Sequence, residues 1–347
     1  MSDIGIEKTG HVALVEIRRP PNNFFDIPLI KDIAGAFESF DEDSNIRAIV
    51  LAAQGKAFCA GANFGDGSTL DAQGRRSNEP GPGVAPLYIE GNRLFRTKKP
   101  IIAAVHGAAV GGGLGLAMVA DFRVTCPEAR FCANFTRLGF HPGFGLTVTL
   151  PAVIGETKAA LMFYTSRRVP GDEAYAMGLA DVLVRQDQVR DAAIKLAAEI
   201  GENSPLGLIA TRMTMRGGIA DRVREATDHE LEEQTRLRKT DDFREGVKSV
   251  SGTARTRFQG TVSDACTLHA RTCKMYRRHS AAWLCRGTHG FKTVHRGGGD
   301  RRAHHETRLV RGPRPPAMHG RSVVPHYDVA AAPAVYVARP GRCRGLH

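Results

Sequence analysis

The chain has 347 residues, 42% of them hydrophobic, which is enough for one large domain or two ordinary ones. No window reaches the roughly 18 apolar residues of a membrane-spanning helix. The first ten residues, MSDIGIEKTG, lack the basic start and apolar run of a signal peptide. We therefore expect a globular, cytoplasmic protein that does not enter a membrane.

The formal net charge of +12 comes entirely from the end of the chain. Residues 261–347 contain 16 Lys and Arg but 4 Asp and Glu, together with nine of the thirteen histidines. This tail is rich in Arg, His, Gly and Pro and has no apolar periodicity, which predicts a mostly disordered segment. Its Cys and His residues match no usual zinc spacing, so no metal site is predicted. Nucleic-acid binding by the tail stays open, whereas none is expected for residues 1–260, whose charges balance.

Apolar periodicity predicts a mixed α/β arrangement in the first half of the chain. Residues 11–17 (HVALVEI) and 46–53 (IRAIVLAA) have the pattern of strands, and residues 28–43 between them have that of a helix. The order strand, helix, strand favours a parallel pair of strands. Two further strands and a short buried helix are predicted at residues 100–107, 121–126 and 114–120.

The second half is predicted to be mainly helical. A short strand is expected at residues 180–184, and helices are expected at residues 171–178, 187–200, 209–218 and 221–240. Between residues 64 and 90 the sequence is rich in Gly, Pro and charge, which predicts a mobile loop that covers a site.

Three consecutive glycines, residues 111–113, stand where a predicted strand meets a predicted helix. The stretch matches neither the dinucleotide nor the phosphate-loop pattern, and the chain contains no GxSxG elbow. Close packing of a tight turn is one interpretation. The other is a turn whose N–H groups bind a ligand oxygen, as half of an oxyanion hole. The segment GKAFCAGANF, residues 55–64, follows its own strand in the same way and would supply the other half.

Five segments occur in an order typical of one enzyme family. They are GKAFCAGANF, KKPIIAAVHGAAVGGGLGLAMVADFRV, ARFCANFTRLGFHPGFG, TSRRVPGDEAYAMGLADVLV and DFREGVKSVSGTARTRFQG. In these segments the chain resembles the crotonase superfamily, which includes the enoyl-CoA hydratases and isomerases. The resemblance covers about residues 5–260.

The resemblance implies an α/β fold built as a spiral of ββα units, here residues 1–195. A helical trimerisation region, residues 196–260, would follow, and the basic tail, residues 261–347, would lie outside the family fold. It also implies an acyl-CoA substrate and a homotrimer or a dimer of trimers. No separate cofactor is expected, because coenzyme A is part of the substrate.

By the same resemblance, the two oxyanion donors are the backbone N–H groups of Ala62 and Gly112. They would stabilise an enolate or a tetrahedral oxyanion on the thioester carbonyl. Further substrate-binding positions are expected at Ala60, Asn63, Phe64, Gly111, Gly113 and Phe135.

The sequence departs from the family at both positions where hydratases carry a glutamate. These positions are occupied by Gly115 and Phe135, neither of which transfers a proton. Hydration by two glutamates is therefore not expected. Isomerisation, decarboxylation and hydrolysis of acyl-CoA thioesters, in fatty acid or aromatic acid metabolism, stay open, and so does a noncatalytic acyl-CoA-binding role.

Other side chains are candidates for acid/base work. His141, in FHPGFG, is the first candidate because a neutral imidazole transfers protons near pH 7. Tyr88, Glu90 and Asp66 come next, each with a structural role as the alternative. His106 and the three cysteines before residue 260 are read as structural, the cysteines as small buried thiols.

Overall fold

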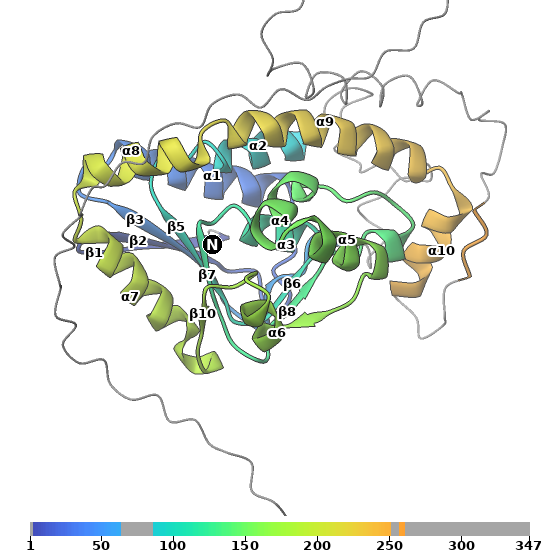
Figure 1. Ribbon diagram of the computed structural model, residues 1–347, viewed down its shortest axis with the longest axis horizontal. Coiled ribbons are helices and arrows are strands. Elements are labelled where there is room, and N and C mark those ends of the chain that lie inside the picture. The colour runs from blue at the N-terminus through green and yellow to red at the C-terminus, as the bar shows by residue number, and fades with distance from the viewer. Residues whose placement is uncertain (1–2, 64–85, 251–256, 261–347) are drawn as a thin grey trace, which may run out of the picture. The chain divides into compact units, whose positions relative to one another are not determined.

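Two β-sheets with helices packed around them form the described part of the chain, as the computed structural model shows (Figure 1). The structure describes residues 3–63, 86–250 and 257–260, which all belong to the structural unit Met1–His269. The predictions for Phe64, Asp66, most of the loop at residues 64–90 and the basic tail lie outside the described residues.

The larger sheet has six strands in the order β1-β2-β3-β5-β7-β10. β1 and β2 are antiparallel, and every other neighbouring pair is parallel. The predicted parallel pairing across the first helix is confirmed, because Val12 of β2 lies beside Ala48 of β3 in a parallel register. The strands are β1 (Ile4–Thr9), β2 (Val12–Ile17), β3 (Ala48–Ala53), β5 (Ile101–Val105), β7 (Phe122–Thr125) and β10 (Val182–Leu183).

The smaller sheet has four short strands in the order β4-β6-β8-β9. The first two pairs are parallel and the last is antiparallel. The strands are β4 (Ala57–Cys59), β6 (Ala108–Val110), β8 (Arg130–Cys132) and β9 (Val169–Pro170). Strands of two or three residues are too short to show a period of two, and sequence periodicity did not predict them.

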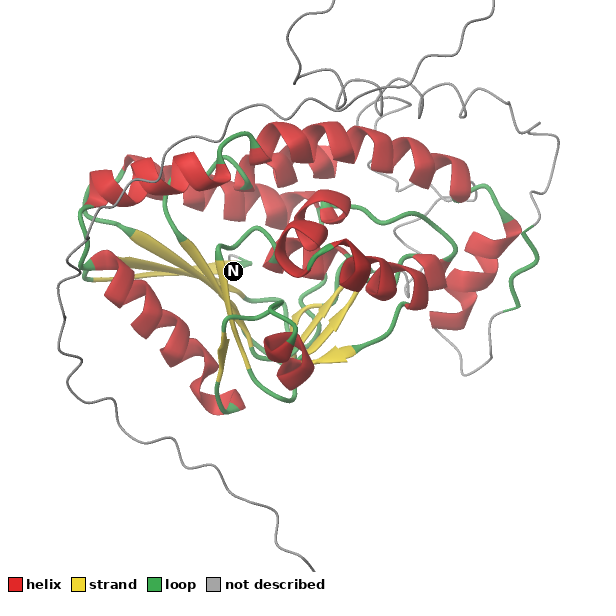
Figure 2. Cartoon of the chain, in the orientation of Figure 1, coloured by secondary structure: helices red, strands yellow, loops and turns green. Residues whose placement is uncertain are grey.

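Helices cover both faces of the larger sheet, as Figure 2 shows. α7 packs on one face against β2, β3, β5 and β7, and α1 packs on the other against β1 and β2. The helices of the first part are α1 (Ile27–Glu42), α2 (Pro86–Leu94), α3 (Gly112–Ala117), α4 (Leu146–Ile154), α5 (Glu156–Thr165) and α6 (Gly171–Ala176). Those of the later part are α7 (Val189–Gly201), α8 (Pro205–Arg216), α9 (Ile219–Leu237) and α10 (Asp241–Val250).

The first predicted helix agrees with α1 to within a residue at each end. Asp26 caps its N-terminus, since its carboxylate accepts a hydrogen bond of 3.0 Å from Leu29 N. The apolar positions spaced three to four residues apart all face the core; they are Leu29, Ile33, Phe37 and Phe40, each at most 1% exposed.

The predicted loop between residues 64 and 90 is wrong at its end. α2 begins at Pro86, so Tyr88 and Glu90 lie on a helix rather than on a loop. Proline at the start of a helix is favourable, because its missing N–H would have no partner there. The segment before Pro86 is rich in Pro and Gly, so the sequence pattern does not indicate that a helix begins there.

Within the described residues, no helix is long and apolar enough to cross a membrane. The cytoplasmic location and the domain boundaries at residues 195 and 260 stay predictions.

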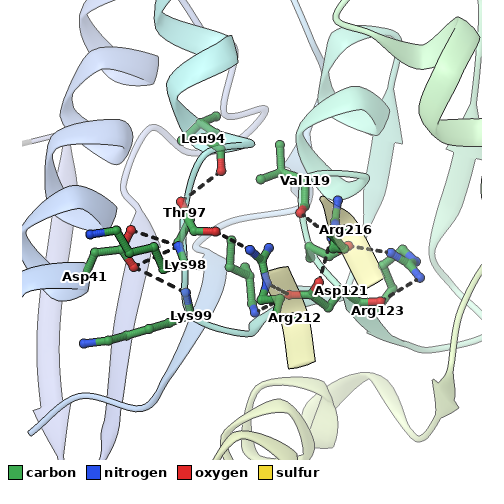
Figure 3. A network of polar contacts seen from close by, with 12 residues as sticks. Asp41, Leu94, Thr97, Lys98, Lys99, Val119, Asp121, Arg123, Arg212 and Arg216 are labelled. Atoms are coloured by element: carbon green, nitrogen blue, oxygen red, sulfur yellow. Dashed lines mark hydrogen bonds and ion pairs between the residues drawn. The ribbon is translucent and has the colours of Figure 1, made fainter. Parts of the chain in front are cut away.

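α8 is held to the rest of the fold by a largely buried carboxylate, that of Asp121, which is 13% exposed and lies just before β7 (Figure 3). Its carboxylate accepts hydrogen bonds of 2.8 Å from Arg212 Nε, Arg216 Nη1 and Ile101 N. Arg212 also donates to the carbonyl oxygen of Thr97, in the segment before β5. One carboxylate therefore joins α8 to two strands of the larger sheet.

The charge of Asp121 is maintained by its partners. Burial alone would raise the pKa of Asp121, but Arg212 and Arg216 together hold it below its ordinary value. Because the folded-state pKa is lowered, this group stabilises the fold above the unfolded pKa, and the contribution is lost as pH falls through the folded pKa.

Replacing Asp121 by asparagine should destabilise the protein strongly at neutral pH. The change leaves two arginines without their charge partner, of which Arg212 is buried, and removal of one member of a buried pair costs about 3–5 kcal/mol. Urea unfolding at pH 7.5 measures the change. Asp187→Asn is the matched control, because the Arg185–Asp187 pair is exposed and should contribute at most about 1 kcal/mol. Equal stabilities of the two variants would contradict this account of α8.

Candidate active site

The turn after β4 and the turn after β6 lie in contact. Gly61 has φ of +80°, a region that favours glycine. A methyl group on Gly61 would lie 2.6 Å from Val110 O and 3.4 Å from Gly112 N. The sequence predicts that two such turns meet, and the structure places them together.

The three glycines of the second turn are required by a positive φ or by a close approach. Gly111 has φ of +56°, and its N–H donates to Cys132 O at 2.8 Å, which ties the turn to β8. A Cβ on Gly112 would lie 2.3 Å from Phe25 Cζ, and one on Gly113 would lie 1.9 Å from Cys59 O. Close packing thus accounts for all three glycines, and it is compatible with a ligand-binding N–H at Gly112, which is the partly exposed one of the three.

The residues that carry the predicted donor groups, Ala62 and Gly112, are both partly exposed. α3 begins at Gly112, so the N–H groups of its first turn have no carbonyl partner inside the helix. Among the described residues, neither Ala62 N nor Gly112 N has a hydrogen-bond acceptor. The turn after β4 is fixed by two hydrogen bonds to the segment before α1. Ala60 N donates to Asn22 O at 2.9 Å, and Phe25 N donates to Gly61 O at 3.0 Å.

Phenylalanine rings surround the glycine turn. The Phe25 ring lies against Gly112, and Phe135 Cζ lies 3.8 Å from where a Cβ of Gly111 would be. Phe25 also packs on Phe144, with ring centroids 5.5 Å apart. All three rings are at most 6% exposed. The turn therefore has an apolar, water-poor wall.

Gly115 cannot accept a larger side chain while Phe144 is present. A Cβ on Gly115 would lie 2.8 Å from Phe144 Cβ and 2.9 Å from Phe144 Cδ1. The space that the Cβ of a glutamate at position 115 would use is therefore already occupied by Phe144. The sequence shows that a carboxylate is missing at position 115, but it does not show that Phe144 and Phe25 line the turn, because these contacts join segments distant in sequence.

A comparison with known families decides where this arrangement belongs. The family model described as enoyl-CoA hydratase/isomerase matches residues 7–261. The chain belongs to the enoyl-CoA hydratase/isomerase family. The match ends one residue into the basic tail, which begins at residue 261.

Named relatives agree with this family. A short-chain-enoyl-CoA hydratase of Clostridium acetobutylicum is 30% identical over 226 residues, which are 63% of this chain and 83% of the relative. A probable enoyl-CoA hydratase, EchA14, of Mycobacterium tuberculosis is 35% identical over 231 residues, 65% of this chain and 86% of the relative.

Solved structures show the same fold. An enoyl-CoA hydratase/isomerase from Pseudoalteromonas atlantica T6c has a TM-score of 0.66 at 24% identity, covering 74% of this chain and all of that one. An enoyl-CoA hydratase subunit from Geobacillus kaustophilus has a TM-score of 0.57 at 28% identity, covering 75% and 99%. The predicted crotonase-like spiral fold is therefore confirmed.

His141, the predicted acid/base residue of this family member, contacts its own loop and α9. Its Nδ1 lies 2.8 Å from Pro142 O, and its ring meets that of His229 edge to face, with centroids 5.9 Å apart. Burial lowers the pKa of His141, and the neighbouring His229 and Arg236 lower it further. The imidazole is therefore neutral near pH 7, but the residue of this loop that touches α3 is Phe144. A catalytic role of His141 stays a prediction.

The other candidates have structural partners. Tyr88 donates to Gln234 Oε1 at 3.0 Å, and burial raises the pKa of its hydroxyl above the ordinary value. Glu90 forms an ion pair with Arg93, which also binds Glu38 of α1. His106 Nε2 lies 3.0 Å from the carbonyl oxygen of Gly55.

The three cysteines of the described residues are free, buried thiols, as predicted. Burial raises the pKa of Cys59 to about 12, so it is not a thiolate at neutral pH. In the described ranges, no group of three His, Cys, Asp or Glu side chains is placed to hold a metal ion.

The lowered pKa of His141 predicts a dependence of stability on pH. Folding disfavours the protonated imidazole, so this group's contribution is complete above the ordinary value of 6.5 and is lost as pH falls through the folded pKa. His141→Asn keeps an N–H donor for Pro142 O but cannot be protonated. Urea unfolding at pH 7.5 and pH 5.5 should show a smaller loss of stability for the variant. An unchanged loss would mean that His141 does not titrate with folding.

Proposed function

We propose that this protein is an acyl-CoA thioester-processing enzyme of the enoyl-CoA hydratase/isomerase type, in which Ala62 N–H and Gly112 N–H stabilise an enolate or oxyanion. The observation that carries the proposal is the contact between the two turns, in which Gly61 lies against Gly112 N. Two N–H groups fixed by tight turns cost no reorganisation when charge develops on the thioester oxygen. The family of the chain and its named relatives support the same substrate class.

The reaction we propose is one that needs an enolate but not a pair of carboxylates. Gly115 and Phe135 stand where hydration would need glutamates, and Phe144 fills the space beside Gly115. Isomerisation with one base, decarboxylation and hydrolysis of an acyl-CoA meet this requirement. The apolar wall of Phe25, Phe135 and Phe144 favours an apolar acyl group next to the carbonyl.

The site as proposed needs no separate cofactor, since the thioester carries coenzyme A. A noncatalytic acyl-CoA-binding role is the second candidate, and the replacement of both carboxylates favours it. Turnover separates the two: binding of acyl-CoA without conversion of any thioester in the panel below would establish the second candidate.

Removal of the Gly112 N–H should abolish most of the activity, and the chain offers a matched control. A side chain at position 112 would meet the Phe25 ring, so both variants are made in a Phe25→Ala background. Gly112→Ala keeps the N–H, whereas Gly112→Pro removes it at the first position of a helix, where proline is tolerated. We expect the proline variant to be about 10²–10³-fold slower than the alanine variant.

The measurement uses a panel of straight-chain, aromatic and β-carboxylated CoA thioesters. Loss of enoyl absorbance and mass spectrometry of the products report the reaction, and circular dichroism checks that both variants fold. Equal rates of the folded alanine and proline variants would overturn the role of Gly112.

We also propose a homotrimer or a dimer of trimers. The exposed apolar side chains of α5 and α8 support an interface; they are Leu161, Tyr164, Leu206, Met213 and Met215. Sedimentation equilibrium should give three or six times the mass of one chain. A monomer at micromolar concentration would contradict this proposal.

A further inference from the structure

Phe144 has an unusual backbone conformation for a bulky residue. Its φ is +61°, and it stands between Gly143 and Gly145 in the turn that leads into α4. Positive φ is uncommon for residues with a side chain and persists where the surroundings hold it. Phe144 is also 3% exposed, so the turn directs a large ring into the interior.

The ring of Phe144 lies between α2, α3 and Phe25. Its Cζ would be 3.2 Å from a Cβ of Gly91 on α2, and its Cβ would be 2.8 Å from a Cβ of Gly115 on α3. Phe25, 5.5 Å away between ring centroids, in turn lies against Gly112. The wall beside the donor N–H therefore runs from Gly112 through Phe25 to Phe144.

The distance between this ring and a thioester bound at Gly112 is limited by helix geometry. Gly115 is one turn beyond Gly112 and lies on the same side of α3, a rise of about 5 Å along the axis. A thioester oxygen bound by Gly112 N–H has its α- and β-carbons at a comparable distance. Under the proposed function, the Phe144 ring would therefore lie within reach of these two carbons.

α9 holds both ends of the turn that carries Phe144. Glu230 Oε2 accepts from Gly145 N at 2.9 Å, at the start of α4. Gln234 Nε2 donates to His141 O at 3.0 Å, and Gln234 Oε1 accepts from the Tyr88 hydroxyl at 3.0 Å. Glu230 and Gln234 lie one helical turn apart and are both buried.

We propose that Phe144 is a specificity-determining residue that restricts the site to acyl groups unbranched at the α- and β-carbons, and that Gln234 is a positioning residue for it. The inference rests on the proposed function, because it places the thioester oxygen at Gly112. Phe144 acts by occupying space, and Gln234 acts by joining α2 and the Phe144 turn to α9.

Binding of paired CoA thioesters tests the role of Phe144. Calorimetry compares butanoyl-CoA with 3-methylbutanoyl-CoA on the full chain, for wild type, Phe144→Leu and the control Phe37→Leu. Phe37 is fully buried on α1, so its variant removes a comparable core volume. We expect Phe144→Leu to improve the affinity for the branched relative to the straight thioester by roughly tenfold or more, since a methyl group is discriminated by that much in apolar pockets. Phe37→Leu should leave the ratio unchanged.

The outcomes separate the two proposals. Binding of butanoyl-CoA with the same ratio in wild type and Phe144→Leu would overturn the role of Phe144 while leaving the proposed function intact. Failure of wild type to bind either thioester would overturn both. If Phe144→Leu does not fold, Phe144→Met, which is closer in volume, is measured in the same way.

Gln234→Leu tests the positioning role with the same ratio. The variant removes the hydrogen bonds to His141 O and the Tyr88 hydroxyl without altering Phe144 itself. A shift of the branched-to-straight ratio in the direction of Phe144→Leu supports positioning. A loss of thermal stability with an unchanged ratio would show that Gln234 is structural only. Glu232→Gln, at an exposed position of the same helix, is the control.

Discussion

The parallel pairing of β4 with β6 is the constraint on which the rest of the site depends. It brings the ends of two short strands side by side, so that the turn containing Gly61 lies against the first turn of α3. The backbone of Cys59 occupies the place where a side chain at position 113 would be, so only glycine fits at that position. The separation of the Ala62 and Gly112 N–H groups, which we propose as the oxyanion donors, is thus set by backbone packing rather than by flexible side chains.

The elements with long apolar periods could be predicted from the sequence. The helix at residues 28–43 and the strand at residues 46–53 match α1 and β3, because α1 buries one face at helical spacing and β3 is a short apolar run that is buried almost throughout. The smaller sheet could not be predicted in this way, since its strands have two or three residues. α2 was missed because the Pro- and Gly-rich composition before it continues to its first residue.

For the site, motif order led to Ala62 and Gly112, whose surroundings agree with the donor roles assigned to them. The same motifs gave no sign that Phe25 or Phe144 would line the turn. These contacts join α2, α3, the loop before α1 and the loop before α4, and no local pattern records such a convergence. The one local signal was a phenylalanine between two glycines in FHPGFG, where glycine permits a conformation that directs the ring inward.

The contact between Gly115 and Phe144 also limits the order in which the sequence can change. A glutamate at position 115 would collide with the Phe144 side chain, so that substitution is harmful while the ring is present. If Phe144 is replaced by a smaller residue first, the protein contains a cavity until Gly115 is replaced by a larger residue. The two positions are therefore coupled, and each single change from this glycine and this ring toward a glutamate at position 115 passes through a less well packed protein.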